Sequence, residues 1–153
     1  MKKTQIPDME AFHALLRRYD LKATPQRMAV HSAMMELVHA SADEVAAQIS
    51  DRADVKITVA SVYNILSTLA DCGFYQRRMS ADNKMYFDVI SSPHVHIYDA
   101  VAHEYTDVTD DALTTMVGEY LKRKRFKGYR VERVDIQLVC RPTRTLSKKK
   151  SQR

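Results

Sequence analysis

The order of apolar patterns in the first half of the chain constrains the fold more than any other feature. Four stretches carry apolar side chains three and four positions apart, which predicts four amphipathic helices. Two further stretches alternate apolar and polar residues on either side of a polar turn at residues 80–83, which predicts a β-hairpin. A set of packed helices followed by a hairpin is therefore expected in this half.

Capping residues predict where these helices begin and end. A first helix is expected over residues 10–19. The next three helices start at the N-cap residues Thr24, Ser41 and Thr58, whose hydroxyl groups can accept hydrogen bonds from the first helical turn. Gly73 stands where the fourth helix needs a left-handed residue at its end.

The short connection at residues 53–57 is expected to place the fourth helix across the third, as in a helix-turn-helix. Strands are expected at residues 74–79 and 84–90, so the hairpin follows the helix pair directly. This order predicts an α+β fold that begins with a winged helix-turn-helix. A small α+β domain without any role in DNA binding has the same order of elements and remains the alternative.

The pattern in the second half of the chain predicts a separate α/β unit. Strands are expected at residues 94–100 and 104–108, a helix from Asp110 to about Phe126, and a long alternating strand at residues 129–139. A unit of about 50 residues has a marginal core of its own. Pairing with an identical unit is the simplest way to cover its sheet, so we expect a homodimer.

We therefore predict a winged-helix DNA-binding domain at residues 1–89, an α/β dimerisation domain at 90–140 and a disordered basic tail at 141–153. The net charge of +5 comes from that tail, because residues 1–89 carry equal numbers of acidic and basic side chains. Such a tail either binds polyanions weakly or is simply solvated. The net charge therefore does not indicate DNA binding, and only sequence motifs can.

The sequence predicts a cytoplasmic protein with no membrane association. No run approaches the roughly 18–20 apolar residues of a membrane span, and no apolar segment follows the N-terminus as in a signal peptide. Cys72 and Cys140 do not form a C-x-x-C pair, so neither a disulfide framework nor a thiolate zinc knuckle is expected within one chain.

Histidines and carboxylates suggest a metal site. His94 and His96 lie two positions apart in an extended segment, so both imidazoles point the same way. Asp88 and Asp107 end neighbouring strands, and His39 precedes the third helix at a hinge position. This nitrogen and oxygen set suits Fe(II), Mn(II), Zn(II) or Co(II). The lack of a nearby thiolate argues against a closed structural zinc site.

A catalytic role for the same cluster finds less support. The sequence has no Gly-rich phosphate loop, no nucleophile elbow and no H-E-x-x-H motif. We therefore predict that the protein is not an enzyme, and a metalloenzyme or metal-storage protein is the less favoured reading. His13 and His31 lie within amphipathic helices and are expected to pack or to face solvent, and His103 is expected in a loop.

Five motifs together resemble the ferric uptake regulator (Fur) family over roughly residues 10–140. They are L-K-A-T-P-Q-R at 21–27, H-A-S-A-D-E at 39–44, I-T-V-A-S-V-Y-N-I-L at 57–66, Y-F-D at 86–88 and H-V-H at 94–96. The resemblance implies a bacterial metal-responsive repressor that binds a double-stranded DNA operator, expected to be an inverted repeat. It also implies a dimer with an N-terminal winged helix and a C-terminal dimerisation domain.

The resemblance assigns roles to individual residues. It implies a regulatory metal site between the domains that consists of His39, Asp88, His94, His96 and Asp107. It implies DNA contacts from the fourth helix, from the start of the second helix and from the segment before it, and these residues are Lys22, Arg27, Ala60, Ser61, Tyr63 and Asn64.

Three departures from the family pattern narrow this prediction. Asn64 replaces the usual arginine, which affects the expected base preference. Asp99 and Ala102 occupy the positions of the family's C-x-x-C motif, so no structural zinc bound by four cysteines is expected, and Pro93 and Val95 replace residues of a third site. One divalent metal per chain, Fe(II), Zn(II) or Mn(II), is therefore expected. A haem-responsive regulator with histidine or tyrosine as axial ligand is the alternative on the same fold.

Overall fold

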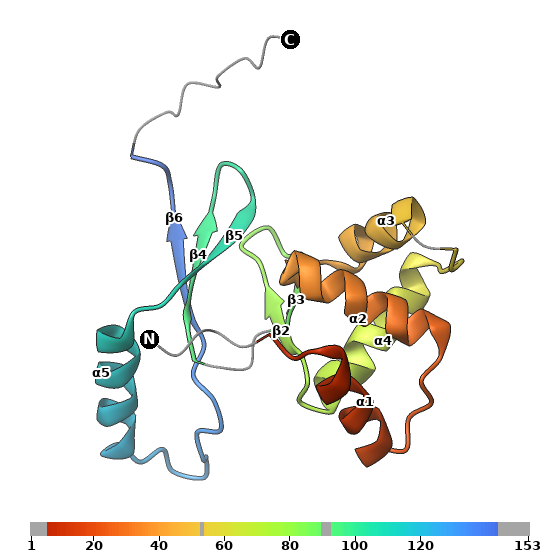
Figure 1. Cartoon of the computed structure of the whole chain (residues 1–153). Helices are drawn as coiled ribbons and strands as arrows, with labels where there is room; N and C mark the ends of the chain where they lie inside the picture. The colour runs from red at the N-terminus through yellow and green to blue at the C-terminus, as the bar shows by residue number, and fades with distance from the viewer. Residues whose placement is uncertain (1–5, 53, 90–92, 144–153) are drawn as a thin grey trace. The chain divides into compact units, whose positions relative to one another are not determined.

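The computed structural model describes residues 6–52, 54–89 and 93–143 (Figure 1). The chain divides into two compact units, Met1–Ser92 and Pro93–Arg153. Of the predicted basic tail at 141–153, residues 144–153 lie outside the described residues. No described helix is long and apolar enough to cross a membrane.

The N-terminal unit contains the four expected helices. They are α1 (Met9–Arg18), α2 (Pro25–Leu37), α3 (Ala42–Arg52) and α4 (Val59–Asp71). The side chains of Asp8, Thr24 and Thr58 accept hydrogen bonds from backbone amides at the starts of α1, α2 and α4. Ser41 and Glu44 form the expected capping box, in which the Ser41 amide donates to Glu44 Oε2 at 2.7 Å.

Three strands complete this unit: β1 (His39–Ala40), β2 (Gln76–Met79) and β3 (Met85–Asp88), in the order β1-β3-β2. Both neighbouring pairs are antiparallel. β1 is not predicted from the sequence, because two residues are too short for an alternating pattern to show. His39 therefore belongs to the sheet, opposite Asp88, and is not at a free hinge.

The core of the N-terminal unit lies between the helices and the inner face of this sheet. The fully buried side chains of Val62, Leu66 and Leu69 form one stripe along α4, at the predicted spacing of three and four. They belong to the same apolar cluster as Phe12 of α1 and Phe87 of β3. This packing fixes the opposite face of α4 towards solvent.

The C-terminal unit contains β4 (Val95–Asp99), β5 (Glu104–Val108), α5 (Asp111–Lys122) and β6 (Ile136–Cys140). The sheet order is β5-β4-β6, and Figure 1 shows β4 between its two neighbours. β4 pairs antiparallel with β5 and parallel with β6. The central strand therefore brings together side chains from both flanking strands.

Two predicted boundaries in this unit were wrong. The helix ends at Lys122 and does not continue to Phe126, which instead forms an antiparallel bridge with Tyr129 around a turn at Gly128, whose φ is +82°. The last strand begins at Ile136 and not at residue 129. A strand needs a hydrogen-bonded partner, and on this side of the sheet the five residues of β4 pair with Ile136–Cys140.

Candidate metal centre and nucleic-acid interface

Strand pairing in the C-terminal unit brings two histidines and one aspartate together. His96 on β4 lies opposite Asp107 on β5 in the antiparallel register. The Oδ1 atom of Asp107 lies 3.0 Å from Nδ1 of His96 and 3.5 Å from Nε2 of His94. The two imidazole rings are 4.2 Å apart between centroids. The H-x-H motif and the aspartate therefore form one cluster, as the sequence predicts for these three residues.

The cluster fits a divalent transition metal. Metal–ligand bonds of about 2.0–2.1 Å at tetrahedral angles separate neighbouring ligand atoms by roughly 3.3 Å. The Asp107 distances of 3.0 and 3.5 Å bracket that value. His96 is 1% exposed and His94 is 9% exposed, so the imidazoles are already withdrawn from water. Two nitrogens and one carboxylate oxygen suit Fe(II), Mn(II), Zn(II) or Co(II).

The N-terminal unit contains a His/Asp pair of its own. The register of β1 and β3 places His39 opposite Asp88, with Nδ1 of the histidine 3.6 Å from Oδ1 of the aspartate. The other oxygen of Asp88 lies 3.9 Å from Nη2 of Arg78, and both of these side chains are almost fully buried. Asp88 is therefore held between a cation and an imidazole within its own unit.

Asp135, which no sequence motif indicates, also lies near His96. Its Oδ1 atom is 3.9 Å from Nε2 of His96. Asp135 immediately precedes β6, which pairs in parallel with the strand of His96. The signal that could have identified it is that parallel pairing, which a single sequence does not reveal.

The exposed face of α4 carries the residues expected to contact DNA. Ala60, Tyr63 and Asn64 are exposed, whereas Ser61 is half-buried. The backbone amide of Ser61 donates to Thr58 Oγ1 at 3.1 Å, and its hydroxyl accepts from the same atom at 3.0 Å. Ser61 therefore helps to cap the helix, which leaves the exposed face to the other three.

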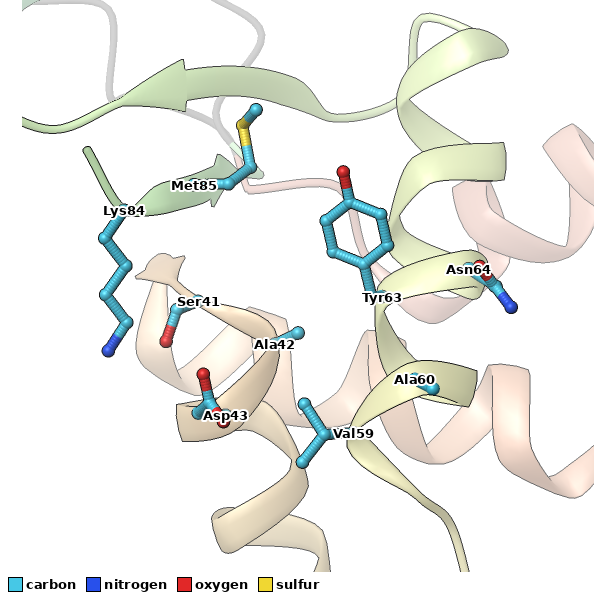
Figure 2. A pocket seen from close by; sticks show the side chains of 9 residues that line it. All are labelled: Ser41, Ala42, Asp43, Val59, Ala60, Tyr63, Asn64, Lys84 and Met85. Carbon is cyan, nitrogen blue, oxygen red and sulfur yellow. The ribbon is translucent and has the colours of Figure 1, made fainter.

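Tyr63 lies beside a groove of about 300 Å³ between the starts of α3 and α4 and the strand β3 (Figure 2). Its ring packs edge-on against Phe87, with centroids 5.9 Å apart and an interplanar angle of 76°. Both Tyr63 and Asn64 line this groove, and Figure 2 shows them on different sides of α4, with the Tyr63 ring on the side of Met85. The two side chains thus present different parts of the surface of α4.

Lys22 and Arg27 lie at the start of α2. Lys22 is exposed, and its backbone carbonyl accepts a hydrogen bond from Nη1 of Arg27 at 2.7 Å. Arg27 thus holds the connection between α1 and α2 in addition to any external contact. The remaining guanidinium N–H groups can still donate to a phosphate.

The profile of the ferric uptake regulator family matches residues 18–138, which is most of the chain. The chain belongs to the ferric uptake regulator family. Members of this family are metal-responsive, DNA-binding transcription regulators. No curated protein matches the sequence.

Solved structures of the Fur family share the fold of this protein. The ferric uptake regulator of Vibrio cholerae has a TM-score of 0.71 and 21% identity over 86% of this chain and 99% of that chain. The Pseudomonas aeruginosa regulator, solved with manganese, has a TM-score of 0.71 and 19% identity over 86% of this chain and 98% of that one. The Helicobacter pylori regulator, described as having three functional metal binding sites, has a TM-score of 0.71 and 20% identity over 94% and 95%.

These comparisons confirm the predicted fold class. The Fur-family chain is α+β, with an N-terminal winged helix-turn-helix followed by a small α/β dimerisation domain. The neighbours are less than 25% identical to it, so they establish the fold and not the ligands of this protein.

Asp99 closes the turn after β4 with hydrogen bonds. Its Oδ1 atom accepts from the backbone amides of Val101 at 2.7 Å and Ala102 at 3.0 Å. Both hydrogen bonds lower the pKa of Asp99, and the one from the Ala102 amide has the larger effect. The Tyr98 hydroxyl lies 2.7 Å from Nδ1 of His103 at the end of the same turn. The turn after β4 is thus organised by polar side chains of its own.

Proposed function

We propose that this Fur-family protein is a metal-dependent transcriptional repressor that binds an inverted-repeat operator as a homodimer. The observation that carries the proposal is the buried cluster of His94, His96 and Asp107, whose ligand atoms all lie within 4.8 Å of one another. Such a cluster in a chain of this family is best explained as the site of the regulatory metal. One divalent ion per chain, Fe(II), Zn(II) or Mn(II), is the proposed signal.

The proposed site is completed by His39 and Asp88 from the N-terminal unit. His39 is 10% exposed in its side chain and is paired with Asp88 through strand register. An ion held by ligands of both units would favour one arrangement of the two recognition helices of the dimer. The ion regulates DNA binding only to the extent that it binds this arrangement more tightly than the others.

The proposed DNA contacts are Tyr63 and Asn64 on α4 for the bases, with Ala60 beside them for apolar contact. Tyr63 and Asn64 are exposed on a helix whose opposite side is fixed in the core. Lys22 and Arg27 are proposed to donate to phosphates, and Ser61 to support the helix start. A dimer would present two such helices to successive major grooves, which matches an inverted repeat.

The proposed dimer explains exposed apolar side chains in the C-terminal unit. α5 has no buried residue, and Met116 and Tyr120 on it are 62% and 53% exposed. On β6, Val139 is 58% exposed. Several exposed apolar side chains on one small unit indicate a surface that another subunit covers.

The test combines metal analysis with DNA binding. Protein purified with its metal should contain one ion per chain and should bind a selected operator more tightly than random DNA. Chelation should remove the ion and weaken operator binding on the order of 5–150-fold, and adding the metal back should restore it. Equal operator affinity with and without the ion would contradict metal control.

The same preparation separates the alternatives. If haem, and not Fe(II) or Zn(II), changes operator affinity and gives an absorption band with the protein, the signal is haem. If chelation leaves DNA binding intact but abolishes a hydrolytic activity or a store of many ions, the cluster serves a metalloenzyme or metal-storage function.

A further inference from the structure

We propose that Asp135 belongs to the metal centre as a positioning residue, whose carboxylate accepts a hydrogen bond from the second ring nitrogen of His96. The inference rests on the proposed function insofar as it requires metal to bind at His94, His96 and Asp107. It does not require that this metal control DNA binding. No motif or comparison assigns a role to Asp135.

The His96 imidazole lies between two carboxylates that come from the two neighbours of β4. Its Nδ1 atom is 3.0 Å from Asp107, which β5 contributes. Its Nε2 atom is 3.9 Å from Asp135, which immediately precedes β6. The lone-pair directions of the two ring nitrogens diverge, so only one of them can face a given ion. The other nitrogen then carries a proton and needs an acceptor.

The position of His94 decides which nitrogen faces the ion. Oδ1 of Asp107 lies 3.5 Å from Nε2 of His94 as well as 3.0 Å from Nδ1 of His96, so three donor atoms converge on the Nδ1 side. The carboxylate of Asp135 lies outside the group of mutually close ligand atoms. An ion on the Nδ1 side therefore leaves Nε2–H directed towards Asp135.

The other groups around His96 fit this assignment. The ring of His94 is 4.2 Å away and that of Tyr105 is 6.3 Å away, edge-on. Gln137 lies opposite His96 in the parallel register, but its Oε1 atom accepts a hydrogen bond from the Tyr105 hydroxyl at 3.0 Å. Asp135 lies two residues before Gln137 and has a carboxylate within ion-pair distance of Nε2.

The 3.9 Å between Nε2 of His96 and Oδ1 of Asp135 is longer than a hydrogen bond. The distance can shorten by a rotation of the Asp135 side chain, because that side chain is partly exposed. The Asp135 side chain is 37% exposed, whereas that of His96 is 1% exposed. Asp135 can rotate towards the ring without disturbing the core. A ligand histidine that carries positive charge from a bound ion attracts the carboxylate more strongly than a neutral one does.

A carboxylate in this role fixes the tautomer and orientation of the ligand histidine and raises its basicity. Loss of such a partner typically weakens metal binding by about 10–100-fold without removing a ligand. Because Asp135 adjoins β6, the same interaction would also connect metal binding to the start of that strand.

The experiment is a Co(II) titration of the full-length, metal-free protein, followed by visible absorption, in the wild type and its variants. D135N keeps the size of the side chain and removes its charge. E132Q is the matched control, since Glu132 is exposed and pairs with Arg130 at 3.5 Å. D107N removes a proposed ligand from the same ion. Far-ultraviolet circular dichroism of the metal-free variants establishes that each is folded.

We expect D135N to bind one Co(II) with the same ligand-field bands as the wild type, but about 10–100-fold more weakly. E132Q should match the wild type, D135E should recover part of the affinity, and D107N should change the bands. Wild-type affinity in D135N would overturn the inference, and so would altered bands in D135N, because Asp135 would then be a ligand. No DNA is present, so a failure of metal-controlled repression would leave this result unaffected.

Discussion

His96 and Asp107 face each other across the antiparallel pair of β4 and β5, with Nδ1 of the histidine 3.0 Å from Oδ1 of the aspartate. Two hydrogen-bonded strands fix this contact, so it does not depend on a flexible loop. In the proposed metal site, these two ligands would therefore already be in place before an ion binds. Little conformational freedom needs to be lost on binding, which favours affinity.

We expect His96→Ala to lower metal affinity and to reduce operator affinity in the presence of metal towards the metal-free value. Imidazole is a ligand only when neutral, so wild-type metal affinity should also fall as the pH drops through about 6.5. The difference in operator affinity between metal-loaded and metal-free wild type should correspond to about 1–3 kcal/mol. Isothermal titration with metal and fluorescence anisotropy with operator DNA measure the two effects.

The control for this prediction is His13→Ala. His13 lies on α1, outside the proposed metal site, and its replacement should change neither affinity. If His96→Ala binds the operator as tightly as the metal-loaded wild type, the cluster does not regulate DNA binding.

Tyr63→Ala should reduce operator affinity by about 1–3 kcal/mol, the range for one good base contact. Tyr63 is 42% exposed and its ring makes a T-shaped contact with Phe87, so its removal should leave the fold and the metal content unchanged. Competition between operator and random DNA, with metal present, measures the loss. An unchanged preference for the operator would mean that Tyr63 does not read the bases.

The double variant of Cys72→Ser and Cys140→Ser should remain a folded dimer with its metal. Both cysteines are free and half-buried, and burial raises the pKa of the Cys72 thiol, which disfavours the thiolate that a metal requires. Analytical ultracentrifugation and elemental analysis check the two expectations. Stoichiometric loss of metal in the double variant would reveal a thiolate site.

Metal-free protein should lose stability as the pH falls from 6.5 to 4 because of His31. Burial lowers the pKa of His31 to about 4, and its Nδ1 atom lies 2.7 Å from the buried Tyr75 hydroxyl. The unfolded chain therefore binds this proton at a higher pH than the folded one. Above pH 6.5 this effect costs the folded protein nothing. As the pH falls from 6.5 to 4 the free energy of unfolding decreases, and the total loss is about 3 kcal/mol once the pH is below 4.

Urea unfolding across this pH range should show the decline for the wild type. The variant His31→Gln, which cannot take up the proton, should be less stable at neutral pH but should show a smaller decline. If the two proteins show the same decline, other groups account for the pH dependence.

Periodic and capping patterns in the sequence were sufficient to predict the helices and most of the strands. Thr24 and Thr58 cap the expected helices, and Val62, Leu66 and Leu69 form the expected buried stripe. These signals act over three or four residues, so they can be read without knowledge of the fold. The H-x-H motif is equally local, since alternate residues of any strand share a face.

Partners that are distant in sequence were decided by the tertiary structure. The pairing of His39 with Asp88 depends on β1, which is too short to leave a pattern, and the approach of Asp135 to His96 depends on the parallel pairing of β4 with β6. For the same reason the last strand is shorter than its alternating sequence, because β4 offers only five partners. Local pattern determines which face a side chain takes, whereas the hydrogen-bonded register between distant strands determines which side chain it meets.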